Sequence, residues 1–157
     1  MSLSLLEHSS YAPRRFTRRK TLDHLTPAAR SANMAKIRAT ETSPEKLVRS
    51  KLFNQGFRFR KNDSRLPGRP DIVLPKYKVA VFVNGCFWHG HDCRRASLPK
   101  TNSSTWQQKI EKNKLRDQKN ISDLRSQGWS VHVIWTCSLA AGMNEISDVL
   151  CGLRKNL

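Results

Sequence analysis

The chain has 157 residues, a length that suits one compact domain with short appendages. It carries 29 lysines and arginines against 12 acidic residues, which gives a formal net charge of +17. This charge favours a polyanionic partner, most simply nucleic acid, over an anionic membrane surface, because no basic amphipathic helix with an aromatic face is evident. No apolar run is long enough for a transmembrane helix, and the first residues lack the pattern of a secretory signal.

The N-terminal 26 residues are predicted to form a basic arm. The run RRFTRRK at residues 14–20 can be a solvated, disordered tail and also an electrostatic clamp on phosphates, since such tails often order only on a nucleic acid. We expect residues 27–157 to form a single folded domain. Thr26-Pro27 is a helix-start pattern and predicts a short helix over about residues 27–39.

The following segments alternate between helical and strand patterns. Ser43-Pro44-Glu45 starts a second helix, which Gly56 ends. The next expected elements are strands at 57–60, 71–74 and 79–83, a long helix at about 104–127, a strand at 129–135 and a final helix at about 145–153. This order predicts an α/β or α+β protein with a mixed central sheet flanked by helices.

One carboxylate lies on the apolar face of the predicted long helix. Spacings of three or four place six residues on that face: Trp106, Ile110, Asn113, Asp117, Ile121 and Leu124. Because the other positions are mostly charged or amide residues, Asp117 is expected to point inward. A buried carboxylate is costly without a partner, so Asp117 is either a satisfied structural residue or an acid that orients a histidine or a metal. The histidine-bearing loop before this helix favours the second interpretation.

That loop, within the sequence VFVNGCFWHGHDC, follows an apolar strand and contains several potential metal ligands. They are Cys86, His89, His91 and Cys93, and Cys137 would join them if the last strand shares their sheet. A tetrahedral zinc site needs four nitrogen or sulfur ligands, so one histidine is left over, and the spacing does not decide which. The alternative is that the cysteines are small buried hydrophobes and the histidines lie on the surface. We expect the spare histidine near Asp71, where carboxylate oxygens would suit magnesium.

Four segments carry a family resemblance: LPGRPDIV, VFVNGCFWHGHDC, KNKLRDQKN and GWSVHVIWTC. Over about residues 30–140 the chain resembles the very-short-patch-repair endonucleases, and the GCFWH block is highly specific for that family. The resemblance implies a restriction-endonuclease-like core and a bacterial cytoplasmic enzyme that acts as a monomer on double-stranded DNA. It further implies recognition of a T:G mismatch and magnesium-dependent nicking 5′ of the mismatched thymine, with mismatch-repair proteins as candidate partners.

The resemblance also implies roles for single residues. Asp71 matches a magnesium-binding aspartate, and Val83 matches the position whose backbone carbonyl completes that site. His89 matches the histidine proposed to activate water, Asp117 its partner, and Glu45 a further acidic member. The structural zinc ligands match Cys86, His91, Cys93 and Cys137.

Three residues match groups that insert into the DNA. Phe87 and Trp88 match aromatics that wedge in beside the mismatch, and Met34 matches a residue inserted from the other groove. Exposed aromatics that unstack a base step sense how easily that step deforms. The alternative for Phe87 and Trp88 is ordinary packing in the core. We also expect DNA contacts from Lys36, Arg38 and Arg69.

The sequence departs from the family pattern at Asn84, where a histidine or an acid is frequent. The general acid-x-Lys element of restriction-type nucleases is also missing, so His89 and Asp117 would have to substitute for it. Two other interpretations stay open at this point. One is a DNA-binding zinc module without catalysis, and the other is a nuclease that cuts both strands of an unmodified site.

Overall fold

The structure is a computed structural model that describes residues 26–36, 40–100 and 102–156. The chain divides into two compact units, Met1–Ile37 and Arg38–Leu157. In the first unit, α1 (Pro27–Ala35) begins after Thr26, whose hydroxyl accepts a hydrogen bond from the Ala29 amide at 3.2 Å. The helix ends earlier than predicted, at Ala35 with Lys36 as its C-cap. Residues 37–39 lie outside the described residues.

The second unit contains a four-stranded mixed sheet in the order β1-β2-β3-β4. The strands are β1 (Arg60–Lys61), β2 (Ile72–Leu74), β3 (Val79–Asn84) and β4 (Ser130–Trp135). β1 pairs antiparallel with β2, and β2 pairs antiparallel with β3. β3 and β4 are parallel, as expected for strands that a helix connects. The predicted mixed sheet is therefore confirmed.

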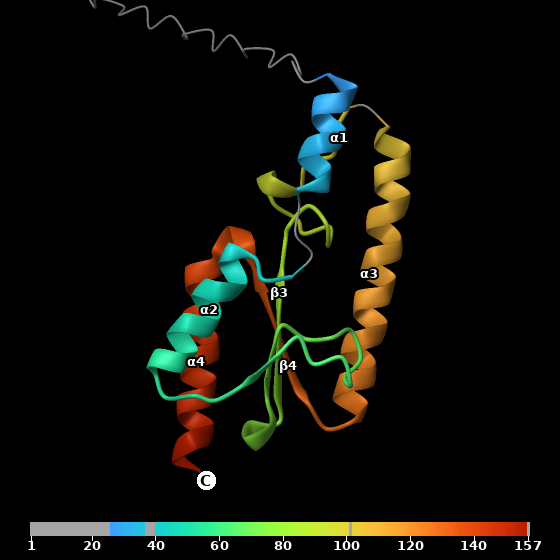
Figure 1. Cartoon of the computed structure of the whole chain (residues 1–157). Coiled ribbons are helices and arrows are strands. Elements are labelled where there is room, and N and C mark those ends of the chain that lie inside the picture. The colour runs from blue at the N-terminus through green and yellow to red at the C-terminus, as the bar shows by residue number, and fades with distance from the viewer. Residues whose placement is uncertain (1–25, 37–39, 101, 157) are drawn as a thin grey trace, which may run out of the picture. The chain divides into compact units, whose positions relative to one another are not determined.

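Helices cover both faces of this sheet (Figure 1). α2 (Ser43–Asn54) and α4 (Leu139–Lys155) lie on one face, and α3 (Ser103–Ser126) lies on the other. Short 3-10 turns connect the elements at Pro75–Tyr77, Arg94–Ala96 and Thr136–Ser138. None of the helices in the described residues is long and apolar enough to cross a membrane.

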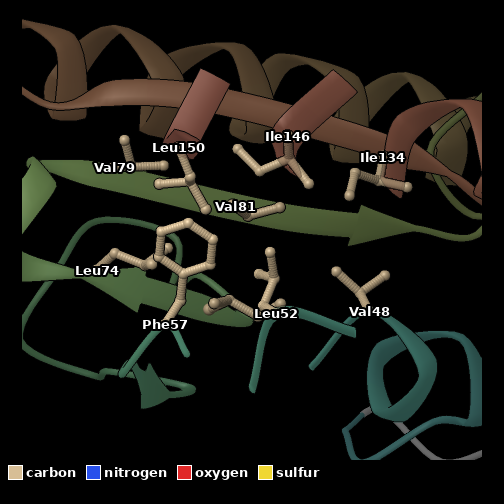
Figure 2. Close-up of a cluster of buried hydrophobic side chains, with 10 residues drawn as sticks. Val48, Leu52, Phe57, Leu74, Val79, Val81, Ile134, Ile146 and Leu150 are labelled. Atoms are coloured by element: carbon tan, nitrogen blue, oxygen red, sulfur yellow. The ribbon is translucent and has the colours of Figure 1, made fainter. Parts of the chain in front are cut away.

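The main hydrophobic core fills the space between the sheet and the α2 and α4 helices (Figure 2). Its buried members are Val48, Leu52, Phe57, Ile72, Leu74, Val79, Val81, Ile134, Ile146 and Leu150. Alternate residues of the central strands, Val73 and Ala80, are also buried but are not part of this cluster. They face the opposite side of the sheet, as the two-residue period of a strand requires.

The predicted inner face of α3 is confirmed. Ile110 and Leu124 are buried, and the four other members of the predicted face are half-buried, whereas most of the remaining helix is exposed. Asp117 thus lies on the face of α3 that packs against the rest of the unit. Its side chain is 21% exposed.

Two predicted elements differ from the structure. Residues 57–60 keep the predicted alternation of buried and exposed side chains, but only Arg60 of this segment belongs to a strand. The Phe57 amide instead donates to the Leu52 carbonyl at 3.0 Å, so this part of the segment closes the end of α2. α4 begins at Leu139, six residues before the predicted start. Position 142 within this helix requires glycine, because a Cβ there would lie 2.7 Å from Ile134 Cγ2.

Candidate active site and metal cluster

The histidine predicted to be catalytic contacts the aspartate on the inner face of α3. His89 Nδ1 lies 2.5 Å from Asp117 Oδ2. Burial alone would raise the pKa of Asp117, but the hydrogen bond with His89 and the charges of His89 and Arg116 outweigh it and lower this pKa. Asp117 is therefore an ionised acceptor, which places the proton on His89 Nδ1 and leaves Nε2 as the basic nitrogen.

A glycine allows the loop to approach α3 this closely. Gly90 has a φ of +61°, and a Cβ at this position would lie 2.7 Å from Ile110 Cγ2. The loop is also held to α3 by a hydrogen bond that the Asn113 side-chain amide donates to the Trp88 carbonyl, at 2.9 Å. These contacts fix the loop on both sides of His89.

Asp71 lies immediately before β2, with its carboxylate directed at the neighbouring strand. Its Oδ2 accepts a hydrogen bond from the Val83 amide at 2.7 Å. Burial raises the pKa of Asp71 to about 6, and the negative charge of Glu45 adds to this, while the Val83 bond and the charges of Arg49 and His89 oppose it. Asp71, Glu45 and His89 are therefore close enough to interact electrostatically.

Glu45 is buried and caps the start of α2. Its carboxylate accepts the amides of Glu41 at 3.0 Å and Thr42 at 3.3 Å, together with the Thr42 hydroxyl at 2.7 Å. Arg49, one turn further along α2, donates to Glu45 Oε2 at 3.4 Å. The carboxylate of Glu45 is thus immobilised, and it contributes a fixed negative charge beside Asp71.

Four of the five candidate zinc ligands form one cluster that could hold a metal ion. Cys86, His91, Cys93 and Cys137 have ligand atoms that all lie within 4.8 Å of one another. Cys137 Sγ is 3.4 Å from His91 Nδ1, although the two residues come from separate loops. His89 is the histidine left over, since its ring contacts Asp117 instead.

The environment of the cluster acts in opposite directions on two of its thiols, Cys86 and Cys137. Burial would raise the pKa of Cys86, but hydrogen bonds with Thr136, Cys137 and Cys93 outweigh it and lower this pKa. Burial and the neighbouring thiols raise the pKa of Cys137. The His91 ring stacks on Trp135 with 4.3 Å between centroids, which fixes the orientation of the imidazole.

The Phe87-Trp88 pair packs with a third aromatic residue, Trp106 of α3. The three rings meet edge to face, with centroids 5.1 to 5.8 Å apart. The ammonium group of Lys109 lies over both tryptophan rings, at 5.6 and 5.5 Å from their centroids. All three aromatics are half-buried and lie outside the main core cluster, so this patch is not part of that core.

The other residues predicted to contact DNA fall in different parts of the chain. Met34 and Lys36 are exposed in the first unit, and Arg38 lies outside the described residues. Arg69 is exposed, adopts a φ of +52° and donates from Nε to the Asn62 carbonyl at 3.1 Å. Asn84, the position of the family departure, is buried at the end of β3.

Sequence reasoning missed Arg49 and Lys109. Arg49 follows Glu45 by four residues, a spacing that predicts an ion pair on a helix and could have found it. Lys109 follows Trp106 by three residues on α3, so its place over the ring is also a helical neighbour contact. The involvement of Trp88, by contrast, depends on the tertiary fold.

A histidine held by an ionised carboxylate, beside a second half-buried carboxylate, can act as a general base, and the net charge of +17 favours a polyanionic substrate. Comparison with known proteins agrees. Residues 22–95 match the family model described as DNA mismatch endonuclease Vsr.

Relatives over a longer stretch lead to the same family. The chain is 53% identical over 117 residues to the type II nicking enzyme V.NmeAIP of Neisseria meningitidis, covering 74% of this chain and 84% of the relative. It is 48% identical over 118 residues to the type II nicking enzyme V.XorIIP of Xanthomonas oryzae, covering 75% and 87%. It is 43% identical over 121 residues to DNA mismatch endonuclease Vsr of Escherichia coli, covering 77% of each chain. The chain belongs to the Vsr family of DNA mismatch endonucleases.

Proposed function

We propose that this endonuclease recognises a T:G mismatch in duplex DNA and nicks one strand 5′ of the mismatched thymine by magnesium-dependent hydrolysis. The observation that carries this proposal is the contact between His89 and Asp117 within electrostatic reach of Asp71. A restriction-endonuclease-like core, with the mixed sheet as its scaffold, is part of the proposal.

The chemistry begins at His89 Nε2. Because Nδ1 is bound to the ionised Asp117, Nε2 is the nitrogen that accepts the proton of the attacking water. The same carboxylate stabilises the imidazolium that results. Glu45, held by the α2 cap, supplies a fixed negative charge to the site.

Magnesium fits the oxygen donors present here. The carboxylate of Asp71 would hold it together with the backbone carbonyl of Val83, next to a second acid at Glu45. When bound, the ion supplies positive charge to the reacting phosphate and lowers the pKa of bound water.

Zinc fits the Cys/His cluster. Three thiols and one imidazole are the donor set of a structural Cys₃His zinc site, and every position is then filled by protein. Zinc would clamp the loop that carries His89 to the turn after β4. Its proposed role is therefore structural, and it holds the catalytic loop in place.

Recognition of the mismatch is assigned to the aromatic patch and the basic residues. Phe87 and Trp88 would enter the DNA beside the T:G pair, which is cheaper to unstack than a matched pair. Met34 would act from the other groove, and Lys36, Arg38 and Arg69 would bind phosphates or groove edges.

The test is a nicking assay on duplexes labelled separately on each strand. T:G and T:A duplexes in several flanking sequences are compared with and without magnesium. Nicking of the thymine strand alone, only in T:G duplexes and only with magnesium, is expected. Equal cleavage of both strands, or equal nicking of the T:A duplex, would contradict the proposal.

A further inference from the structure

Arg49 is unusual in its burial. Within residues 40–100 and 102–156 it is the single lysine or arginine whose side chain is buried, with 7% of that side chain exposed. Removing a guanidinium from water costs several kcal/mol unless opposite charges and hydrogen bonds compensate it, and such cations persist where they are paired or have a function. The partners of Arg49 therefore indicate what its charge does.

Those partners are carboxylates at moderate distance. Arg49 Nη1 lies 3.4 Å from Glu45 Oε2, and Nη2 lies 3.2 Å from Glu41 Oε2. The geometry of the second contact does not make a hydrogen bond, so the buried Nη2 has no hydrogen-bond partner among the residues that the structure describes. Arg49 thus lacks the two-pronged pairing that makes an arginine–carboxylate contact strong. Its main contribution is charge.

That charge reaches the proposed magnesium ligand. The cation of Arg49 lowers the pKa of Asp71, while the anion of Glu45 raises it. The half-buried carboxylate of Asp71, the buried carboxylate of Glu45 and the buried cation of Arg49 consequently interact in a region of low dielectric constant. Electrostatic interactions are stronger there than at the protein surface.

We infer that Arg49 is the resident counter-ion of the Glu45 and Asp71 carboxylates and that its charge sets the magnesium affinity of the site. This inference rests on the proposed function, in which Asp71 binds magnesium. In the magnesium-free protein, Arg49 offsets the repulsion between the two carboxylates. Once magnesium binds, the same cation repels it.

Loss of the charge therefore has two opposite effects. The magnesium-free protein loses stability, because Glu45 and Asp71 repel each other without compensation. Magnesium binds more tightly, because the repelling cation is gone. A purely structural arginine would change stability without tightening magnesium binding, so the second effect distinguishes the two roles.

The experiment uses the full chain with its zinc retained, so magnesium is removed by dialysis and not by a chelator. Magnesium chloride is titrated without DNA at pH 8.5, and binding is followed by calorimetry and by the shift in Tm. The neutral variants Arg49→Met and Arg49→Gln are expected to bind magnesium about tenfold more tightly than the wild type. Their Tm is expected to be lower without magnesium and to recover as it is added.

Two further variants separate charge from structure. Arg49→Lys keeps the charge and is expected to keep the wild-type affinity. Lys61→Met removes an equal charge from another partner of Glu41, at 3.4 Å, but Lys61 is 57% exposed. Its effect on magnesium affinity is expected to stay within about twofold, because water and salt screen it.

Several results would overturn the inference. One is unchanged or weaker magnesium binding by a folded neutral variant, and Arg49→Gln provides this test if Arg49→Met does not fold. Another is equally tightened binding by Arg49→Lys. If the wild type neither binds magnesium nor needs it for nicking, the proposed function falls, and this inference falls with it. If the wild type binds magnesium and the neutral variants match it, this inference alone fails.

Discussion

His89 Nδ1 and Asp117 Oδ2 lie 2.5 Å apart although 28 positions separate the two residues in the chain. The contact joins the loop after β3 to the middle of α3, and both sides are partly shielded from water, with 24% and 21% of the side chains exposed. Partial burial strengthens the interaction between the imidazole and the carboxylate. The pair is thus preorganised before any DNA binds.

Loss of either His89 or Asp117 should reduce the nicking rate more than the affinity for duplex DNA. His89→Ala is expected to lower the nicking rate by at least about 10²-fold, as for a removed general base. Asp117→Asn is expected to act in the same direction, because the amide can donate to Nδ1 and favour the wrong tautomer. Single-turnover nicking and duplex binding by fluorescence anisotropy measure the two effects separately.

A control on the same helix is Asp123→Asn. Asp123 pairs with Lys119 at 2.8 Å on the surface, so this variant removes the same charge from α3 without touching His89. It should nick like the wild type. Nicking by His89→Ala at the wild-type rate would exclude His89 from the mechanism.

The four-residue Cys/His cluster should couple metal content to stability. Cys137→Ser is expected to lose the metal and to lower Tm by about 10 °C or more, since metal binding contributes directly to folding. Elemental analysis of the purified protein and thermal denaturation are the measurements. Cys151→Ser is the matched control, because Cys151 is the cysteine outside the cluster, and it should retain full metal content. A stable, metal-free Cys137→Ser protein would contradict a structural role.

Local pattern was enough to predict the order of the elements and the inner face of α3. The spacing from Trp106 to Leu124 predicted which side of the helix packs inward, and the structure buries that side. Spacing alone left open which histidine joins the cysteines; the resemblance assigned His91, and the structure groups His91 with the three cysteines. The inner face of α3 and the resemblance were together enough to predict Asp117 as the carboxylate partner of His89.

Other features depend on contacts that a linear pattern does not contain. Arg49 is buried beside Glu45 in the folded protein, whereas its sequence position resembles that of any surface arginine. The sequence pattern did not predict the early start of α4, because Gly142 lowers helix propensity. In the structure this glycine fits against Ile134. In the same way, residues 57–59 alternate like a strand, yet no neighbouring strand pairs with them among the described residues.

Asp71 should make the magnesium-free protein less stable at high pH. Its pKa is raised to about 6 in the folded state, so the native protein holds this proton more tightly than the unfolded chain does. Protonated Asp71 therefore stabilises the fold, and this contribution is lost as pH rises through about 6. Asp71→Asn is expected to be more stable than the wild type at pH 8 by on the order of 2 kcal/mol, with the difference vanishing near pH 4.

Denaturation of magnesium-free protein at the two pH values tests this expectation. Asp63→Asn is a control of opposite sign, because the hydrogen bond with Arg65 lowers the pKa of Asp63 to about 2. The charge of Asp63 stabilises the fold above its unfolded pKa, so its removal should destabilise the protein at pH 8. Asp71→Asn should also abolish magnesium-dependent nicking. An Asp71→Asn protein that is less stable than the wild type at pH 8 would contradict the conclusion that the ionised Asp71 carboxylate destabilises the fold.

The aromatic patch should determine discrimination between T:G and T:A duplexes. Trp88 packs with Phe87 and Trp106 outside the main core, so Trp88→Ala is expected to leave the fold intact while the T:G preference falls by about tenfold or more. The ratio of nicking rates on the two duplexes measures this preference. Phe53→Ala removes an aromatic ring that is 55% exposed on α2, and its ratio should equal that of the wild type. An unchanged ratio in a folded Trp88→Ala protein would mean that Trp88 only packs against its neighbours.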